Sequence, residues 1–262
     1  MKRRVILAGI VVSMLWGCGT KTAVQTVDTT ATETATDQMV ERTCRKIDYY
    51  DYSAPVPASA KIDDSYFADT FFGGDSRMGS VALYSDIPAK GAEVYYAESL
   101  RLWMYAETQI QTPSGTATMH DLAMNTARNN IYLLLGINEI RSDSFDDWGA
   151  YYDEIISELL NAKPGVTIYL MMSYLPQSLA DITDDQLKVN VDAINAQMKM
   201  IAVKYHVYLL DIDPSMKDEN GKVREDLVWD GLHFNEAGAQ AYADYIATHV
   251  VRKDDYVKEV CE

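Results

Sequence analysis

Five short apolar runs, separated by longer stretches of helical pattern, constrain the fold of this chain more than any other feature of its sequence. The runs lack the polar alternation of a strand with one wet face, and they fall at Thr70–Gly73, Ala92–Tyr96, Ile131–Leu135, Val166–Ser173 and Val207–Ile212. Continuous apolar strands are typical of parallel sheets that are covered on both faces. The runs therefore predict a buried parallel sheet.

Amphipathic helical patterns lie between the runs. The clearest covers Asp184–Tyr205, where apolar residues recur at three- and four-residue steps and so share one face. A second covers Phe145–Leu160, and a third, Glu236–Val250, follows Asn235, a good N-cap. Strands and helices in alternation predict an α/β fold, a doubly wound sheet that binds ligands at the carboxyl ends of its strands.

The chain begins with a segment that has the features of an export signal. A basic start, Lys2-Arg3-Arg4, precedes an apolar run over residues 5–16 that is too short to span a bilayer. The run leads into Leu15-Trp16-Gly17-Cys18, which resembles a bacterial lipoprotein cleavage box. We expect residues 1–17 to be removed and Cys18 to be lipidated, which would anchor an exported protein to the extracytoplasmic side of a bacterial membrane. The alternative is an ordinary buried thiol in an uncleaved signal.

Composition sets the predicted domain boundaries. From Gly19 to about Thr43 the chain is rich in threonine, alanine and small polar residues, which cannot bury enough surface to offset their ordering entropy. A segment with tyrosine, aspartate and proline follows. The sequence predicts a lipidated cysteine and flexible tether over residues 18–63, and one compact domain over residues 64–262.

Two further cysteines, Cys44 and Cys261, lie near the two ends of the expected folded part. In an oxidising compartment they can form a disulfide that ties these ends together, or they can remain two thiols. One sequence gives no distance between them, so both alternatives stay open.

The chain is strongly acidic. Its formal charge of -16 becomes -19 when the three basic residues of the signal are removed. Nucleic acid and anionic lipid surfaces are therefore poor partners, and we expect contact with a membrane through the lipid anchor only. Negative charge also keeps exported proteins soluble, so it constrains the substrate only weakly.

Three loops at predicted strand ends carry the parts of an acyl-transfer site. The first apolar run continues into Gly74-Asp75-Ser76-Arg77, the third into Gly136-Ile137-Asn138-Glu139, and Asp230-Gly231-Leu232-His233 lies far downstream. A serine nucleophile needs an imidazole to take its proton, and the imidazole needs a carboxylate to fix its tautomer. Ser76, His233 and Asp230 are candidates for these roles, although a serine in an isolated Gly-Asp-Ser is often only a helix cap.

These three motifs, in this order, resemble the blocks of the SGNH or GDSL hydrolase family over most of the region from Phe71 to Val250. The resemblance implies a flavodoxin-like three-layer α/β/α sandwich with about five parallel strands. It makes Ser76 the nucleophile, His233 the base and Asp230 its partner. It also makes Asn138 an oxyanion donor, together with the backbone N–H of Ser76 and that of a glycine.

The sequence departs from the family at two positions. The loop after the second strand, Tyr96-Ala97-Glu98-Ser99-Leu100, has no glycine, and we expect Ser99 to present its backbone N–H instead. Glu139 stands where an aspartate commonly follows the asparagine. We expect Arg77 to pair with Glu139 and hold the two loops in register, with direct substrate contact as the alternative.

The sequence contains no HExxH motif and no clustered cysteine and histidine spacing, so we expect a site without metal or cofactor. Several aromatic residues near the loops, among them Tyr84, Tyr174 and Trp229, can stack on sugar rings or simply pack. The interpretation favoured by the sequence is a serine esterase that hydrolyses short acyl esters, such as acetyl, on envelope or extracellular carbohydrate. The alternatives are a carbohydrate O-acyltransferase with the same triad and a catalytically silent glycan-binding lipoprotein.

Overall fold

A parallel sheet lies at the centre of the structure, a computed structural model that describes residues 44–141, 147–180, 182–212 and 214–261. Its five strands are ordered β3-β2-β6-β7-β8, and every neighbouring pair is parallel. They are β2 (Thr70–Gly74), β3 (Glu93–Tyr96), β6 (Asn130–Leu134), β7 (Thr167–Met171) and β8 (Tyr208–Leu210). All five predicted strands are confirmed, and their order is the flavodoxin-like one.

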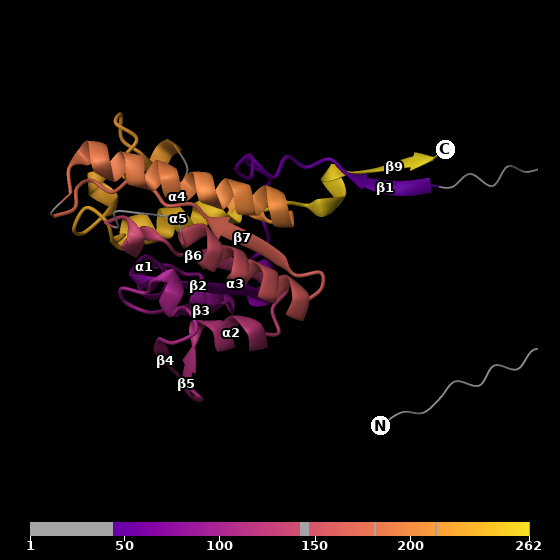
Figure 1. Cartoon of the computed structure of the whole chain (residues 1–262), viewed down its shortest axis with the longest axis horizontal. Coiled ribbons are helices and arrows are strands. Elements are labelled where there is room, and N and C mark those ends of the chain that lie inside the picture. The colour runs from indigo at the N-terminus through magenta and orange to yellow at the C-terminus, as the bar shows by residue number, and fades with distance from the viewer. Residues whose placement is uncertain (1–43, 142–146, 181, 213, 262) are drawn as a thin grey trace, which may run out of the picture. The chain divides into compact units, whose positions relative to one another are not determined.

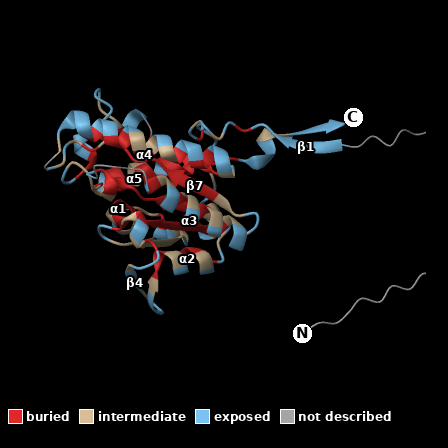
Figure 2. Ribbon diagram, in the orientation of Figure 1, coloured by how far each residue is buried: buried red, intermediate tan, exposed pale blue. Residues whose placement is uncertain are grey.

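Helices cover both faces of the sheet, as Figure 1 shows. One face packs against α1 (Ser76–Tyr84) and α5 (Glu236–Ala247), and the other against α2 (Met119–Asn125), α3 (Trp148–Ala162) and α4 (Asp184–Tyr205). Successive strand residues alternate between the faces, so Leu133 joins one core cluster while Tyr132 and Leu134 join the other. The buried residues on both faces, red in Figure 2, give the predicted three-layer sandwich.

The helix predictions hold with small changes at the ends. α4 has the predicted bounds, and α3 is described from Trp148, because the predicted start at Phe145 falls outside the described residues. The side chain of Asn235 caps α5 by accepting a hydrogen bond from the N–H of Gly238 at 2.9 Å. α5 ends before the predicted Val250, at a point where the Thr248 hydroxyl donates to a carbonyl of the last turn.

The folded unit begins at Cys44, earlier than the predicted boundary at Asp64. β1 (Cys44–Asp48) pairs antiparallel with β9 (Val257–Cys261), and a disulfide joins Cys44 to Cys261. The Val56 N–H also donates to the carbonyl of Leu209 on the edge strand β8. Residues 44–63 are therefore part of the fold, which corrects the predicted tether over residues 18–63. Local composition could not reveal a strand whose partner lies 217 residues away.

The predicted signal peptide, Cys18 and residues 19–43 of the tether lie outside the described residues. None of the helices that the structure describes is both long and apolar enough to cross a membrane. The structure also contains a hairpin that the sequence did not predict, formed by β4 (Gln109–Thr112) and β5 (Gly115–Thr118).

Candidate active site

Ser76 is the first residue of α1 and lies two residues past the end of β2, the strand between β3 and β6 in the sheet. The chain can turn so sharply here because Gly74 has no side chain: a Cβ at this position would lie 2.6 Å from the carbonyl oxygen of Leu134. The side chain of Asp75 caps the helix by accepting from the N–H of Arg77 at 3.0 Å. The half-buried Ser76 thus stands at the carboxyl edge of the sheet, as the sequence predicted.

His233 and Asp230 lie beside Ser76 although they come from the far end of the chain. The Nε2 atom of His233 is 2.8 Å from the Ser76 Oγ, and its Nδ1 atom is 2.7 Å from Oδ2 of Asp230. With Nδ1 protonated, Nε2 is free to accept the serine proton. The three side chains therefore form one continuous hydrogen-bonded relay, in the order that a serine nucleophile requires.

The carboxylate of the relay is held in its ionised form. Partial burial by itself would raise the pKa of Asp230. The hydrogen bonds from the backbone and ring of His233 and from the backbone of Leu232 outweigh that effect and lower the pKa. Oδ1 accepts both backbone N–H groups, at 2.8 Å from His233 and 3.1 Å from Leu232, so Oδ2 remains for the imidazole.

The loop that carries His233 is fixed by two further contacts. The hydroxyl of Tyr174, a buried residue after β7, donates to the carbonyl of Leu232 at 2.6 Å. The N–H of Trp229 donates to the carbonyl of His233 at 2.8 Å. The sequence suggested Tyr174 only as an aromatic residue near the loops that can stack on a sugar ring or pack. Its supporting role depends on a contact between residues 58 positions apart, for which the sequence has no signal.

Asn138 lies in the neighbouring loop, in a single helical turn over Ile137–Glu139 that follows β6. The turn starts at Gly136, whose φ of 110° lies in the left-handed region, and a Cβ there would lie 2.9 Å from the Trp148 ring. The Asn138 amide donates to the carbonyl of Leu100 at 2.9 Å. Since a primary amide has two N–H bonds, the second remains for an oxyanion.

Ser99 takes the backbone conformation that favours glycine, with a φ of 57°. It lies in the loop after β3, which the Ala97 N–H ties to the carbonyl of Gly74 at 3.1 Å and the Asn138 amide ties to Leu100. A serine that occupies a glycine-like conformation fits its predicted place as the substitute for the missing glycine. Its use as an oxyanion donor stays a prediction.

The predicted ion pair between Arg77 and Glu139 is wrong. Arg77 binds the carboxylate of Asp75 through two nitrogens, Nε at 3.0 Å and Nη2 at 2.9 Å, and both side chains are fully buried. Glu139 instead accepts a hydrogen bond from the N–H of Leu102 at 2.6 Å. Arg77 pairs with Asp75 and not with Glu139 because Asp75 directly precedes the helix and both of its carboxylate oxygens can accept from the guanidinium group.

Glu139 is a buried carboxyl group with one free oxygen. Its side chain is almost inaccessible, and Oε2 has no hydrogen-bond partner among the described residues. Burial raises the pKa of Glu139 to about 7, the Leu102 N–H lowers it, and the charge of Asp75 adds to the rise. Together with Asn138, this residue fixes the backbone from Leu100 to Leu102, the segment that follows Ser99.

Exposed aromatic rings flank the loops of the site. Trp229, next to Asp230, is 64% exposed and packs edge-on against the half-exposed Tyr84. Trp103, just after the Ser99 loop, is 41% exposed and lies under the Arg101 guanidinium. Tryptophan is a largely buried residue type on average, so side chains this exposed are uncommon, and the parts of the rings that stay uncovered can contact a ligand.

The described residues offer one cluster with metal-ligating side chains, and it is not at this site. It consists of Cys44, Glu259 and Cys261, whose two sulfurs are joined in the disulfide. Sulfurs that are oxidised to a disulfide are not thiolate ligands, so the residues present do not fit a metal ion.

Comparisons with solved structures agree with the fold. An acetyl xylan esterase superposes with a TM-score of 0.51 at 16% sequence identity, over 70% of this chain and 99% of its own. A protein proposed to be an acylhydrolase, from Bacteroides fragilis, gives 0.52 at 16% identity, over 75% and 89%. A protein proposed to be a lipolytic member of the G-D-S-L family, from Desulfitobacterium hafniense, gives 0.54 at 9% identity, over 70% and 99%. A search of curated proteins found no match.

A family model supplies the evidence that goes beyond the fold. The model of the GDSL-like lipase/acylhydrolase family matches residues 95–241, more than half of the chain. The match includes Ser99, Asn138, Asp230 and His233 and begins after Ser76, which the structure nevertheless places within hydrogen-bonding distance of His233. Family membership supports an ester-hydrolysing enzyme. The chain belongs to the GDSL-like lipase/acylhydrolase family.

Proposed function

We propose that this protein is a serine esterase that removes short acyl groups, acetyl in the first place, from carbohydrate. The observation that carries the proposal is the relay of Ser76, His233 and Asp230, with its two contacts of 2.8 and 2.7 Å. A serine within reach of an imidazole that is itself oriented by an ionised carboxylate is the arrangement that activates a hydroxyl for attack on an ester.

The reaction has two steps. The Ser76 Oγ attacks the ester carbonyl carbon and its proton passes to Nε2 of His233, while the second N–H of Asn138 and the backbone N–H groups of Ser99 and Ser76 hold the oxyanion. The first-turn N–H of a helix has no intrahelical partner, so that of Ser76 is free for this role. The alcohol leaves with the proton from His233. Water then attacks the acyl-serine and gives a proton to His233, which passes that proton to the Ser76 Oγ as the acid leaves and the free serine is restored.

Two observations support carbohydrate as the alcohol part of the ester. The exposed rings of Trp229, Tyr84 and Trp103 flank the site loops and offer apolar faces next to polar groups, the surface on which sugar rings stack. One of the similar folds belongs to an acetyl xylan esterase, a protein that acts on an acetylated sugar polymer by its own description.

Loss of the nucleophile tests the chemical half of the proposal. With a short-chain aryl ester, Ser76→Ala should lower kcat by about 10⁴-fold or more, and it should no longer be labelled by a fluorophosphonate probe. Ser114→Ala, an exposed serine in the turn between β4 and β5, serves as the matched control and should keep full activity. Unchanged turnover or labelling in Ser76→Ala would remove the assignment, and absence of labelling in the wild-type protein would favour a silent glycan-binding protein.

The acceptor is tested separately. Acetylated xylan and acetylated wall polymers are incubated with the protein, with and without added oligosaccharide, and the products are examined by mass spectrometry. Free acetate alone supports hydrolysis, whereas acetyl groups on the added oligosaccharide would show transfer to a sugar hydroxyl.

We also propose that the protein is exported and anchored through Cys18. The support is the signal-like sequence that ends at Cys18, together with a disulfide between Cys44 and Cys261 of the kind that persists in oxidising compartments. Metabolic labelling with a radioactive fatty acid should mark the wild-type protein and spare Cys18→Ala. Equal labelling of both would refute the anchor.

A further inference from the structure

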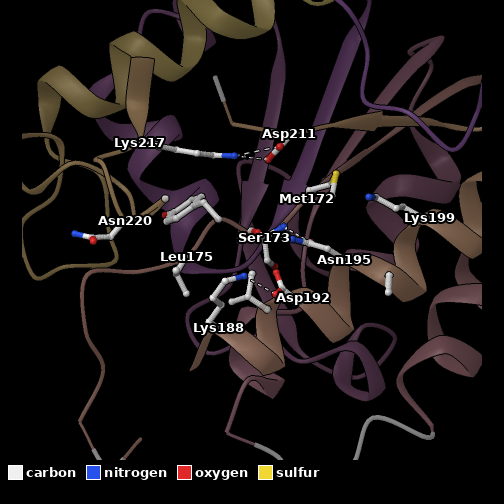
Figure 3. Close-up of a pocket in the computed structure, with 14 residues that line it drawn as sticks. Met172, Ser173, Leu175, Lys188, Asp192, Asn195, Lys199, Asp211, Lys217 and Asn220 are labelled. Carbon is white, nitrogen blue, oxygen red and sulfur yellow. Dashed lines mark hydrogen bonds and ion pairs between the residues drawn. The ribbon is translucent and has the colours of Figure 1, made fainter. Parts of the chain in front are cut away.

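A pocket opens on the carboxyl edge of the sheet, and Figure 3 shows the residues that line it. It has a volume of about 430 Å³ and lies between α4, the residues that follow β7 and β8, and the segment 217–221. That volume falls in the range of pockets that bind small molecules. None of Ser76, His233 and Asp230 lines it, so the relay does not account for it.

The back wall of the pocket is a fixed polar surface. Asn195 of α4 accepts from the N–H of Ser173 at 2.9 Å and donates to the carbonyl of Ser173 at 2.8 Å. These two hydrogen bonds fix the backbone of Ser173, just past the end of β7, against α4. The Ser173 hydroxyl is buried and has no hydrogen-bond partner among the described residues. A buried hydroxyl without a partner is unfavourable, and a ligand that supplies one would relieve it.

The rim of the pocket is positively charged within an acidic chain. Lys217 pairs with Asp211 at 3.1 Å and Lys188 pairs with Asp192 at 2.6 Å. A third lysine, Lys199, has no ion-pair partner in the part of the chain that the structure describes, and Figure 3 shows it at the side of the pocket opposite Lys217. One uncompensated ammonium group thus faces a pocket whose other charges are balanced.

The pocket shares a wall with the loop that carries His233. Tyr174 lines the pocket, and its hydroxyl holds the carbonyl of Leu232. Two residues past the pocket-lining Leu175, the N–H of Gln177 donates to the carbonyl of Gly231 at 2.8 Å. The segment 173–177 therefore separates the pocket from the relay, and both sites open on the same edge of the sheet.

We propose that this pocket binds a sugar residue that carries a carboxylate, as a subsite for an acidic glycan. The alternating ammonium and carboxylate groups of the rim, with the Ser173 hydroxyl, offer the donors and acceptors that a ring with several hydroxyls needs. Lys199 binds the ligand carboxylate, and Met172, Leu175 and Val191 pack against the ring. The inference rests on the proposed function in one respect only: a glycan bound in this pocket would present a neighbouring acylated sugar to Ser76.

Binding of glucuronate and of glucose, measured by NMR titration of the full chain, tests the proposal. Glucuronate should bind in a saturable manner and about tenfold more tightly than glucose, because one charge-assisted contact distinguishes the two. Lys199→Gln should remove that preference, and Ser173→Ala should weaken both sugars. Lys46→Gln, an exposed lysine on β1 that does not line the pocket, is the matched control and should bind like the wild type.

Equal affinities for the two sugars, or an unchanged preference in Lys199→Gln, would overturn the proposal. The outcome is independent of catalysis, because the same titration is done with Ser76→Ala. Binding without any esterase activity would refute the proposed function and leave the subsite standing. Activity on neutral acetylated sugars without binding of glucuronate would refute the subsite and leave the esterase standing.

Discussion

Two aspartates near Ser76 each pair with a basic side chain, and the two pairs differ in how far they are buried. Below Ser76, the carboxylate of Asp75 and the guanidinium of Arg77 meet through two hydrogen bonds and are fully buried. Beside it, Asp230 and His233 meet through one ring nitrogen, with their side chains 56% and 32% exposed. A buried pair of fixed charge suits the start of α1, which must hold Ser76 in a constant position. A pair that must gain and lose a proton during a reaction needs access to solvent and substrate.

The largest expected effect separates the two pairs by activity. Asp230→Asn should lower kcat by about 10⁴-fold, because an asparagine favours the wrong tautomer of His233 and cannot stabilise the imidazolium. Its midpoint in urea should stay close to that of the wild type, since the side chain is more than half exposed. Ester hydrolysis and urea unfolding measure the two quantities. A variant that keeps its rate would place the proton relay elsewhere.

The next effect separates the pairs by stability. Arg77→Met leaves the Asp75 carboxylate buried and unpaired, so the free energy of unfolding should fall by about 3–5 kcal/mol. The matched control is Arg224→Met, which breaks a pair with the exposed side chain of Asp226 at the same sequence spacing. That change should cost about 1 kcal/mol or less. Similar losses in both variants would contradict the structural role of burial described above.

A third prediction concerns the pH dependence of stability, to which the buried carboxyl group of Glu139 contributes. Burial raises its pKa from 4.5 to about 7, so its contribution to stability is full below about pH 4.5 and is lost as the pH rises through 7. The wild type should thus lose about 3 kcal/mol between pH 5 and pH 8 that Glu139→Gln does not lose. Urea unfolding at both pH values gives the difference. Glu98→Gln, an exposed glutamate near Ser99, is the control and should follow the wild type.

The smallest expected effect concerns the loop that carries Ser99. Ser99→Gly should raise the free energy of unfolding by up to about 1 kcal/mol, because glycine adopts a φ of 57° without strain. The rate should stay within about twofold of the wild type, since only the backbone N–H is used. Ser99→Val should instead lower stability, because a β-branched residue tolerates this conformation poorly. A large loss of rate in Ser99→Gly would mean that the hydroxyl takes part.

Local pattern was enough to predict the framework of the site. Continuous apolar runs predicted all five parallel strands, and Asn235 predicted the start of α5, because burial and capping leave marks within a few residues. Parallel strands then bring their carboxyl ends to one edge. This is why residues as distant as Ser76 and His233 could be expected to meet.

The parts that the sequence could not predict concern the choice between several possible partners. Arg77 had two acidic residues to choose from, and only the packing of the helix start selects Asp75 over Glu139. The same holds for β1, whose pairing partner is at the other end of the chain. Residue type alone does not choose between such partners, and the packing of the folded chain does.

The disulfide between Cys44 and Cys261 closes the folded unit into a ring at the end opposite the catalytic edge. α5 starts near the His233 loop and runs the length of the sandwich before the chain reaches β9, so both ends of the unit leave from the same side (Figure 1). The disulfide links Cys44 covalently to β9, in addition to the backbone pairing of β1 with β9. The N-terminal end of the folded unit is therefore fixed far from the strand ends that carry Ser76, His233 and Asp230.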